Sequence, residues 1–184
     1  VKRGTGANHF KDFSFSNPKW IPAGKLTEND CVLYPIVKEN KDIKEIKISN
    51  FIEVKKSGKW IMPFIETHTS NRIKDKIKID SSFMRLIGYY IAEGTVNKHM
   101  LLFFFKRDEN VYINDVKKIL KEKFGLNPKI SFEKNVCRIC LYSKVIADFF
   151  KSQFEKYSYK KNISHWISIL PTSKQKELIK GLWR

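Results

Sequence analysis

The sequence predicts an α+β fold in which a β-rich segment over residues 1–80 precedes a unit of helices and strands over residues 81–170. Three observations predict this class. Apolar residues recur at helical spacing in three stretches after residue 80. Short apolar runs bounded by turn residues separate those stretches. The first 80 residues hold several further strand-like runs. The order of elements after residue 80 favours one sheet with helices on its far side.

The first 80 residues are rich in aromatic, turn and basic residues. A strand is predicted over 31–35, where a turn at 28–30 precedes it and a proline stops it. Residues 37–50 are dense in charge and are expected to form an exposed hairpin or a linker. Strand-like stretches at 51–54 and 60–65 flank a Lys-Lys-Ser-Gly turn. We place a domain boundary near residue 80.

The second region opens with a helix predicted over 83–93. Ser81 or Ser82 can cap its N-terminus, and Gly94 can end it. Because this helix is apolar on nearly every side, we expect it to be buried. Two strands follow, the first including Thr95 and Val96 and the second covering 100–105.

A further helix, a hairpin and a third helix complete the region. The helix begins at Asp108 or Asn110 and ends at Gly125 and Pro128. The hairpin pairs 130–132 with 136–142. Ser143 opens the third helix. The apolar faces expected for the two helices are Ile113, Val116, Ile119, Leu120 and Phe124, and Val145, Ile146, Phe149, Phe150 and Phe154.

Residues 171–184 are expected to form the start of one more helix, with Leu178, Ile179, Leu182 and Trp183 as its apolar residues. This helix has no capping residue at its end. We therefore expect the sequence to be a fragment of a longer protein.

The composition favours a nucleic-acid partner. The chain has 36 Lys and Arg residues against 19 Asp and Glu, a formal net charge of +17. Such an excess attracts phosphate backbones or anionic membrane surfaces, and the alternative is a solubilising lysine-rich surface. No apolar run approaches the ~18–20 residues of a membrane span, and the N-terminus lacks the apolar region of a signal peptide. We expect a cytoplasmic, nucleoid-associated protein without a membrane partner.

The cysteines indicate no metal or disulfide site. Three cysteines in a chain of this size argue against a secreted disulfide framework. Cys137 and Cys140 have CxxC spacing, but no second pair exists to complete a zinc site. On a strand their side chains would lie on opposite faces, so we interpret them as buried strand cysteines.

The segment 86–94, Leu-Ile-Gly-Tyr-Tyr-Ile-Ala-Glu-Gly, could carry chemistry. Gly88 and Ala92 leave one helix face nearly bare, so a second helix can approach with the backbones almost touching. Glu93 lies in the last turn, where a carboxylate opposes the helix dipole unless a cation is near. Two such helices would bring two carboxylates together, and these would share a divalent metal. Spacing alone favours the alternative, a buried helix with Glu93 pointing to solvent.

The same segment resembles the LAGLIDADG motif in the form found in intein endonucleases, where Glu can precede the final glycine. The resemblance implies that Glu93 is the catalytic, metal-binding acid, with Mg²⁺ or Mn²⁺ as cofactor, and that Gly88, Ala92 and Gly94 are packing positions. Residues 179–184 resemble the opening of a second copy. There Gly181 takes the place of Gly88, with a separation of 181 − 88 = 93 residues.

Two wider features extend the resemblance to most of the chain. The predicted order of elements resembles the αββαββα half of the LAGLIDADG homing endonucleases. Residues 20–36 resemble the intein splicing domain just before its endonuclease insertion. The resemblance thus implies three regions: a splicing-domain-like region at 1–80, an endonuclease half at 81–170 and the start of a second LAGLIDADG helix at 171–184.

Several family features are missing from this sequence. The acid of the second motif would stand beyond Arg184, so we expect poor cleavage or none unless two copies pair through Glu93. Val1 replaces the splicing nucleophile and no terminal His-Asn is present, so no self-splicing is expected. His9 lies near the place of a splicing-domain histidine but without the matching Thr-x-x-His pattern.

The resemblance implies that a concave sheet binds the major groove of duplex DNA and that the intact two-motif protein hydrolyses phosphodiester bonds with metal assistance. Five cations on or beside the predicted strands fit this, since Arg reads guanine and Lys fixes phosphate register. They are Lys106, Arg107, Lys129, Lys134 and Arg138. Each is otherwise a solvated surface charge. Lys160 and Lys161 are expected to flank the DNA, and residues 103–105 to be core.

Three other functions stay open. The same fold could serve as a non-cleaving, maturase-like DNA- or RNA-binding module, or the chain could be an inactive intein remnant. In an interaction or splicing-scaffold fragment, the β-rich N-terminal region would dominate. A membrane-surface role is the weakest, because no amphipathic helix sets basic residues opposite an aromatic face.

Overall fold

The computed structural model of the chain describes residues 17–28, 30–32, 40–65 and 70–183. The chain divides into two compact units, Val1–Ile36 and Val37–Arg184. In the first unit, the described residues form a short 3-10 helix, η1 (Ala23–Lys25), and a turn in which the Thr27 backbone N–H donates to Asp30. Most of the strand predicted over 31–35 falls outside the described residues, as does His9.

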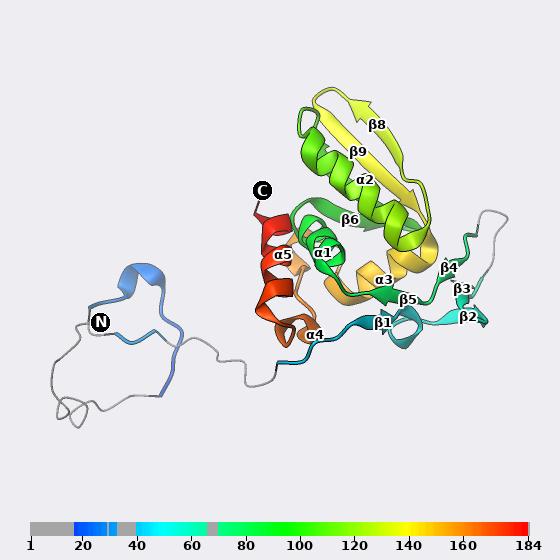
Figure 1. The fold of residues 1–184 in the computed structure, drawn as a ribbon. Helices are drawn as coiled ribbons and strands as arrows, with labels where there is room; N and C mark the ends of the chain where they lie inside the picture. The colour runs from blue at the N-terminus through cyan, green and yellow to red at the C-terminus, as the bar shows by residue number, and fades with distance from the viewer. Residues whose placement is uncertain (1–16, 29, 33–39, 66–69, 184) are drawn as a thin grey trace. The chain divides into compact units, whose positions relative to one another are not determined.

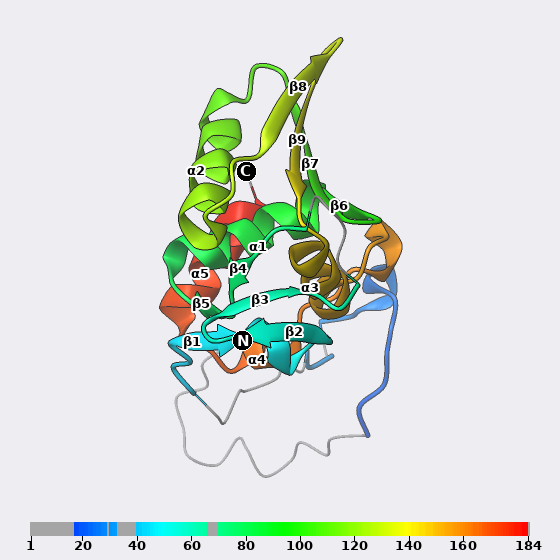
Figure 2. The ribbon, with the colours of Figure 1, turned by 90° about the vertical axis from the view of Figure 1, so that its right-hand side faces the viewer.

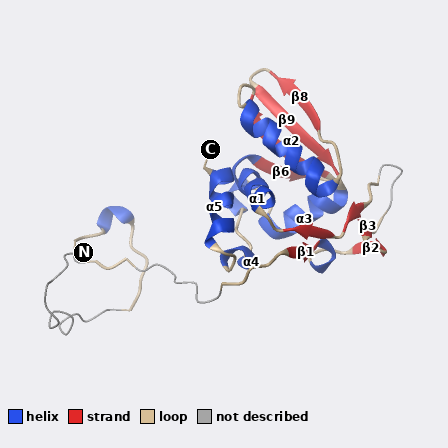
Figure 3. Ribbon diagram, in the orientation of Figure 1, coloured by secondary structure: helices blue, strands red, loops and turns tan. Residues whose placement is uncertain are grey.

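The second unit begins with two small antiparallel sheets (Figures 1 and 3). Their elements are β1 (Glu45–Lys47) paired with β5 (Lys76–Lys78), and β2 (Val54–Ser57), β3 (Trp60–Pro63) and β4 (Ile73–Lys74) in that order, with a 3-10 turn η2 (Ile48–Asn50). The prediction of an exposed hairpin or linker over 37–50 is therefore wrong in part. Ile46 and Ile48 are buried, because β1 pairs with a strand 29 residues further along the chain.

An alternating run of helices and strands follows and confirms the predicted α+β class. Its elements are α1 (Ser81–Glu93), β6 (Gly94–Asn97), β7 (Met100–Lys106), α2 (Asn110–Phe124), β8 (Lys129–Glu133), β9 (Val136–Tyr142) and α3 (Lys144–Phe154). The four strands form an antiparallel sheet in the order β6-β7-β9-β8. The chain then passes through η3 (Ser158–Lys160) and α4 (His165–Ser168) to α5 (Thr172–Leu182).

One side of the four-stranded sheet packs on helices α1, α2 and α3 (Figure 2). Strand alternation places Leu101, Phe103 and Phe105 of β7 on this side, and all three are buried. The apolar faces predicted for α2 and α3 are buried in the same core. Residues on both sides of position 80, where the sequence placed a boundary, contribute to it, including Ile77 and Phe83.

The ends of the helices differ in part from prediction. Asp80, not Ser81 or Ser82, caps α1, because its carboxylate accepts the Phe83 backbone N–H at 3.1 Å. Gly125 ends α2 with a φ of 69°, the left-handed conformation that favours glycine. Ser143 caps α3 as predicted. Among the described residues, no helix combines the length and apolar character needed to cross a bilayer.

Candidate functional site

Helices α1 and α5 approach each other through two glycines, and the ribbons lie side by side (Figure 1). A Cβ on Gly88 would stand 2.2 Å from the carbonyl oxygen of Leu178, and one on Gly181 would stand 2.2 Å from that of Arg85. Each glycine thus faces the residue three positions before the other glycine. This reciprocal contact is the close approach predicted for Gly88, with Gly181 as its counterpart.

A cluster of charged groups beside the glycine contact also holds α1 and α5 together. The Arg85 guanidinium of α1 donates to Asp115 of α2 at 2.6 Å and to Glu177 of α5 at 2.7 Å. Tyr89 donates its hydroxyl to Asp115 at 3.0 Å. Burial, and then the adjacent carboxylate of Asp115, raise the pKa of Tyr89 well above its usual range. Arg85 therefore joins three helices that meet around the glycine contact.

Glu93 is the last residue of α1 and is half-buried. The Lys161 ammonium lies at the same helix end, where it donates to the carbonyl oxygens of Tyr90 (2.7 Å), Ile91 (3.0 Å) and Gly94 (2.6 Å). Burial lowers the pKa of Lys161, and the negative charge of Glu93 opposes that shift. A carboxylate at a helix C-terminus is unfavourable because it meets the negative end of the helix dipole, and the positive charge of Lys161 offsets this effect.

That Lys160 and Lys161 flank DNA stays a prediction; the structure shows the Lys161 ammonium held by three backbone carbonyls. In the sequence, Lys161 stands out only as one of two adjacent lysines in a basic connector, and nothing there indicates its contacts with α1. Only the folded chain brings residue 161 to the end of a helix that lies about 70 positions earlier.

The two other small residues of the motif have different roles. Ala92 is half-buried, in the turn that follows Gly88. Gly94 has a φ of −89° and begins β6, so it does not adopt the left-handed conformation expected of a terminating glycine. A Cβ there would stand 2.3 Å from the Tyr90 ring, so the position requires glycine for space.

Three of the five predicted DNA-binding cations lie on the side of the sheet opposite the helices, here called the open face. Lys106 on β7, Lys129 on β8 and Arg138 on β9 are all exposed. Arg138 donates to Ser131 at 3.2 Å, and the Lys129 ammonium lies 5.3 Å from the centre of the Tyr142 ring. The open face therefore combines basic groups with an aromatic ring.

The other two cations lie at the tip of the sheet. Lys134 occupies the β8–β9 turn with a φ of 50°. Arg107 follows β7, and its guanidinium carbon lies 5.4 Å from the centre of the Phe132 ring. A shallow hollow of about 360 Å³ at this tip is lined by Lys106, Arg107, Asp108 and Asn135. The tip thus extends the basic surface beyond the open face.

The residues between the cations divide between the two sides of the sheet. Phe103 and Phe105 are core, as predicted, whereas Phe104 is 37% exposed on the open face because strand alternation turns it outward. Cys137 and Cys140 are both buried, on opposite sides, which confirms the interpretation of strand cysteines. Burial raises the pKa of both thiols.

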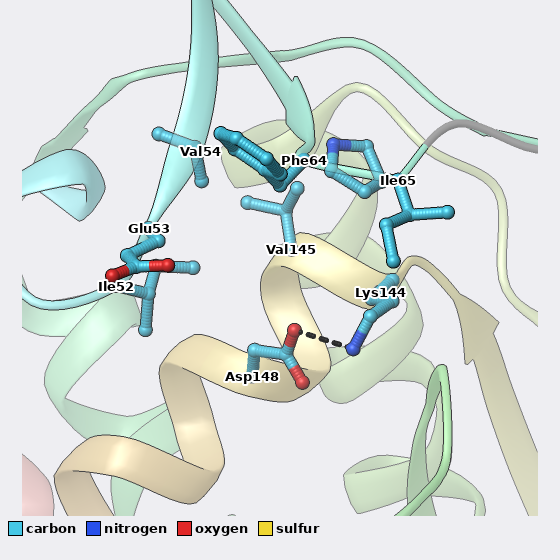
Figure 4. Close-up of a pocket in the computed structure, with 9 residues that line it drawn as sticks. Ile52, Glu53, Val54, Phe64, Ile65, Lys144, Val145 and Asp148 are labelled. Carbon is cyan, nitrogen blue, oxygen red and sulfur yellow. Dashed lines mark hydrogen bonds and ion pairs between the residues drawn. The ribbon is translucent and has the colours of Figure 1, made fainter.

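A second hollow, of about 460 Å³, lies between the β2–β3 hairpin and the start of α3 (Figure 4). Its apolar lining includes Val54, Phe64 and Val145, and its Lys144 and Asp148 pair with each other at 2.8 Å. None of the predicted site residues lines it. Within the part of the chain that the structure describes, no group of three or more His, Cys, Asp or Glu side chains is placed to hold a metal ion.

Fold and site together define an α+β chain with a glycine-mediated helix pair, an acidic residue at one helix end and a basic sheet face. No family model matches it. Two uncharacterized proteins of Methanocaldococcus jannaschii are each 30% identical to it over 90% of this chain, which covers 21% of each relative. An iron-sulfur cluster assembly SufBD family protein of Mycobacterium tuberculosis is 25% identical over 70% of this chain and 12% of its own length. The chain thus spans about a fifth of the archaeal relatives it matches.

Proposed function

We propose that this chain is the first half of an intein-type LAGLIDADG homing endonuclease and that it binds duplex DNA. The reciprocal contact of Gly88 and Gly181 carries the proposal. In the motif that residues 86–94 resemble, two glycine-bearing helices pack together, and here α1 and α5 meet through the matched glycines. The αββαββα order from α1 to α3 supports the same fold.

The pattern of similarity to other proteins supports an intein origin. The matched segment makes up between 12% and 21% of relatives that have different names, from an archaeon and a mycobacterium. A segment that recurs within longer proteins of different kinds behaves as an insertable module. We propose that the region before α1 belongs to the splicing part of such a module.

The proposed DNA surface is the open face with the tip of the sheet. Exposed Lys106, Lys129 and Arg138 share one side of a twisted sheet, and Arg107 and Lys134 extend it. Cations on one face of a sheet can neutralise phosphates along a groove, and Arg138 can also donate two hydrogen bonds to a guanine. The helices on the other side leave this face open to a long ligand.

Glu93 is the proposed catalytic acid. One carboxylate does not complete a Mg²⁺ or Mn²⁺ site, and the described residues add no further acid cluster there. By analogy with Gly88 and Glu93, the second acid would stand five residues after Gly181, beyond Arg184. We propose that metal binding and phosphodiester hydrolysis require that second acid. Because α5 already occupies the Gly88 face of α1, a following motif fits this role better than a second copy that pairs through the same face.

A non-cleaving DNA- or RNA-binding module is the second candidate. The observation that favours it is the Lys161 ammonium, which three backbone carbonyls hold at the end of α1 where Glu93 lies, so that this helix end carries a positive charge without a metal. Such a module would use the same basic surface. The two candidates therefore differ in whether Glu93 takes part in a reaction.

A salt titration of binding to random duplex DNA tests the proposal. If five cations contact phosphates, the logarithm of the binding constant falls against the logarithm of salt concentration with a slope of about −4 to −5. The measurement is fluorescence anisotropy of a labelled duplex at several NaCl concentrations. Binding without salt dependence, or no binding, would contradict the nucleic-acid proposal.

The role of Glu93 is tested separately with Glu93→Gln. We expect unchanged affinity for DNA in EDTA, because the carboxylate is proposed to act on metal and not on the duplex. A nicking assay with Mg²⁺ then distinguishes the candidates: cleavage abolished by Glu93→Gln supports the nuclease, and salt-dependent binding without cleavage supports the binding module or a half-site fragment. Loss of metal-free binding in Glu93→Gln would show that the assigned role is wrong.

A further inference from the structure

Two tyrosines in the segment after α3 stack on each other at the protein surface. The ring centroids of Tyr157 and Tyr159 are 5.6 Å apart, with an angle of 16° between the planes. The exposed fractions are 49% for Tyr157 and 78% for Tyr159. Aromatic rings this exposed gain little from burial, so the stack contributes little to the core.

A lysine ammonium lies over each ring of the stack. Lys156 is 5.1 Å from the centre of Tyr157, and Lys160 is 5.9 Å from the centre of Tyr159. Cation–π contacts at exposed sites are weak. These contacts orient the two ammonium groups. Because the contacts are weak, an anion that binds an ammonium group more strongly can replace the ring.

The segment is held to the end of α1 on both flanks. On one flank, Tyr90 donates its hydroxyl to the Glu155 carbonyl at 2.6 Å, and Thr95 donates to the Lys156 carbonyl at 3.2 Å. On the other, Lys161 binds the three carbonyls at the end of α1. Figure 2 shows this segment, in orange, beside the end of β6.

The backbone at the first anchor is in an unfavourable conformation. Glu155 ends α3 with a φ of 62° and a ψ of 170°, a region that residues other than glycine rarely adopt. Surrounding contacts must hold it there, and the hydrogen bond that its carbonyl accepts from Tyr90 is one of them. The segment that carries the stack is thus attached to the end of α1, the helix whose last residue is Glu93.

We propose that the Tyr157–Tyr159 stack, with Lys156 and Lys160, binds the sugar–phosphate backbone of one DNA strand next to Glu93. The inference rests on the proposed function, because it names a further part of the same DNA site. The ammonium groups donate to phosphate oxygens, and the rings cover the sugars. An apolar protein partner would bury both ammonium groups without counter-charges, which is costly.

The test compares matched double variants of the whole chain in the anisotropy titration. Lys156→Ala/Lys160→Ala should reduce the slope of the salt dependence by about 1.8, the value for two phosphates. Lys117→Ala/Lys121→Ala, which removes two exposed lysines from the solvent side of α2, is the control for lost charge and should keep the wild-type slope.

The rings are tested without changing charge. Tyr157→Ala/Tyr159→Ala should weaken DNA binding, because the lysines lose their support and the sugars lose the rings, whereas Tyr157→Phe/Tyr159→Phe should restore most of the affinity. A third measurement needs no variant: bound DNA should protect Lys156 and Lys160 of the wild-type chain from acetylation, read by mass spectrometry, more than Lys117 and Lys121.

The outcomes separate this inference from the proposed function. Salt-dependent wild-type binding, with a normal slope in Lys156→Ala/Lys160→Ala and no protection of either lysine, overturns the stack as a binding site and leaves the open face in place. No salt-dependent wild-type binding overturns both. A reduced slope and protection of Lys156 and Lys160, with the control unchanged, support the inference.

Discussion

At the scale of single residues, the absence of a side chain determines how closely helices α1 and α5 pack. Gly88 and Gly181 each leave room for a backbone carbonyl of the opposite helix, at 2.2 Å from where a Cβ would stand. Backbone atoms cannot move aside as a flexible side chain can. Substitution at either position should therefore separate the two helices.

Gly88→Ala should lower the free energy of unfolding by about 1–3 kcal/mol, the usual cost of overpacking a filled contact. Chemical denaturation monitored by circular dichroism measures the change. The matched control is Gly24→Ala, where a Cβ would have nothing within 4 Å, and its effect should stay within about 0.5 kcal/mol. Equal stability of Gly88→Ala and wild type would contradict the close contact.

Asp80 links the start of α1 to pH. Burial raises the pKa of this carboxyl, but hydrogen bonds from Lys123, Ser82 and the Phe83 backbone outweigh burial and lower it below 3.8. A carboxyl whose pKa is lower in the folded state stabilises that state above the unfolded pKa, and the stability is lost as the pH falls through the folded pKa.

We therefore expect wild-type protein to lose stability as the pH falls below about 4, in part through Asp80. Asp80→Asn keeps a capping side chain but removes the charge, so it should be less stable at pH 7, and the gap should close at low pH. Urea denaturation at pH 7 and at low pH measures the gap. A gap that does not depend on pH would show that the carboxylate charge is unimportant.

At the scale of elements, α5 depends on contacts with other helices. Leu178 and Gly181 are its buried residues, whereas Ile179 is 52% exposed and Trp183, just after the helix, is 86% exposed. The apolar face predicted for this helix therefore does not pack as a whole. The ion pair of Arg85 with Glu177 supplies a second attachment to α1.

Arg85→Ala should loosen α5 by about 1–3 kcal/mol, because it removes the charge-assisted hydrogen bonds from the guanidinium to Asp115 and Glu177. Hydrogen exchange by mass spectrometry should show faster exchange in 172–182. Lys180→Ala, which removes a more exposed partner of the same Glu177, is the control and should leave that exchange nearly unchanged. Unchanged exchange in Arg85→Ala would mean that the glycine contact alone holds the helix.

At the scale of the whole second unit, the four-stranded sheet separates two kinds of surface. Its helix side is filled by the common core, which also takes in residues from the small sheets before α1. Its open face carries Lys106, Lys129 and Arg138, together with exposed Phe104 and Val136. This is the face proposed above to bind DNA.

Replacing all three open-face cations by alanine should reduce the slope of the DNA salt titration by about 2.7, or 0.9 for each lost phosphate contact. The triple variant Lys117→Ala/Lys118→Ala/Lys121→Ala on the solvent side of α2 removes the same charge and should have little effect. If both variants lowered the slope equally, DNA would be attracted by net charge alone and the open face would not be its site.

Local patterns in the sequence predicted most elements of the region after residue 80. The apolar spacing of α2 and α3 and the capping residues Gly125 and Ser143 depend on contacts within a few residues of each other. Gly88 and Glu93 could be singled out for the same reason, since their spacing lies within one helix. The pairing of β1 with β5 could not, because nothing local joins residues 45–47 to 76–78.

Short-range periodicity was thus enough to predict the α+β class, the order of elements from α1 to α3, and the buried faces of α2 and α3. The folded chain was needed to show that Lys161 holds the end of α1, that Arg85 joins three helices, and that the segment with the Tyr157–Tyr159 stack is attached to α1. These contacts join residues about 30 to 90 positions apart. Their partners are chosen by how the packed core arranges the chain, and no local spacing records that choice.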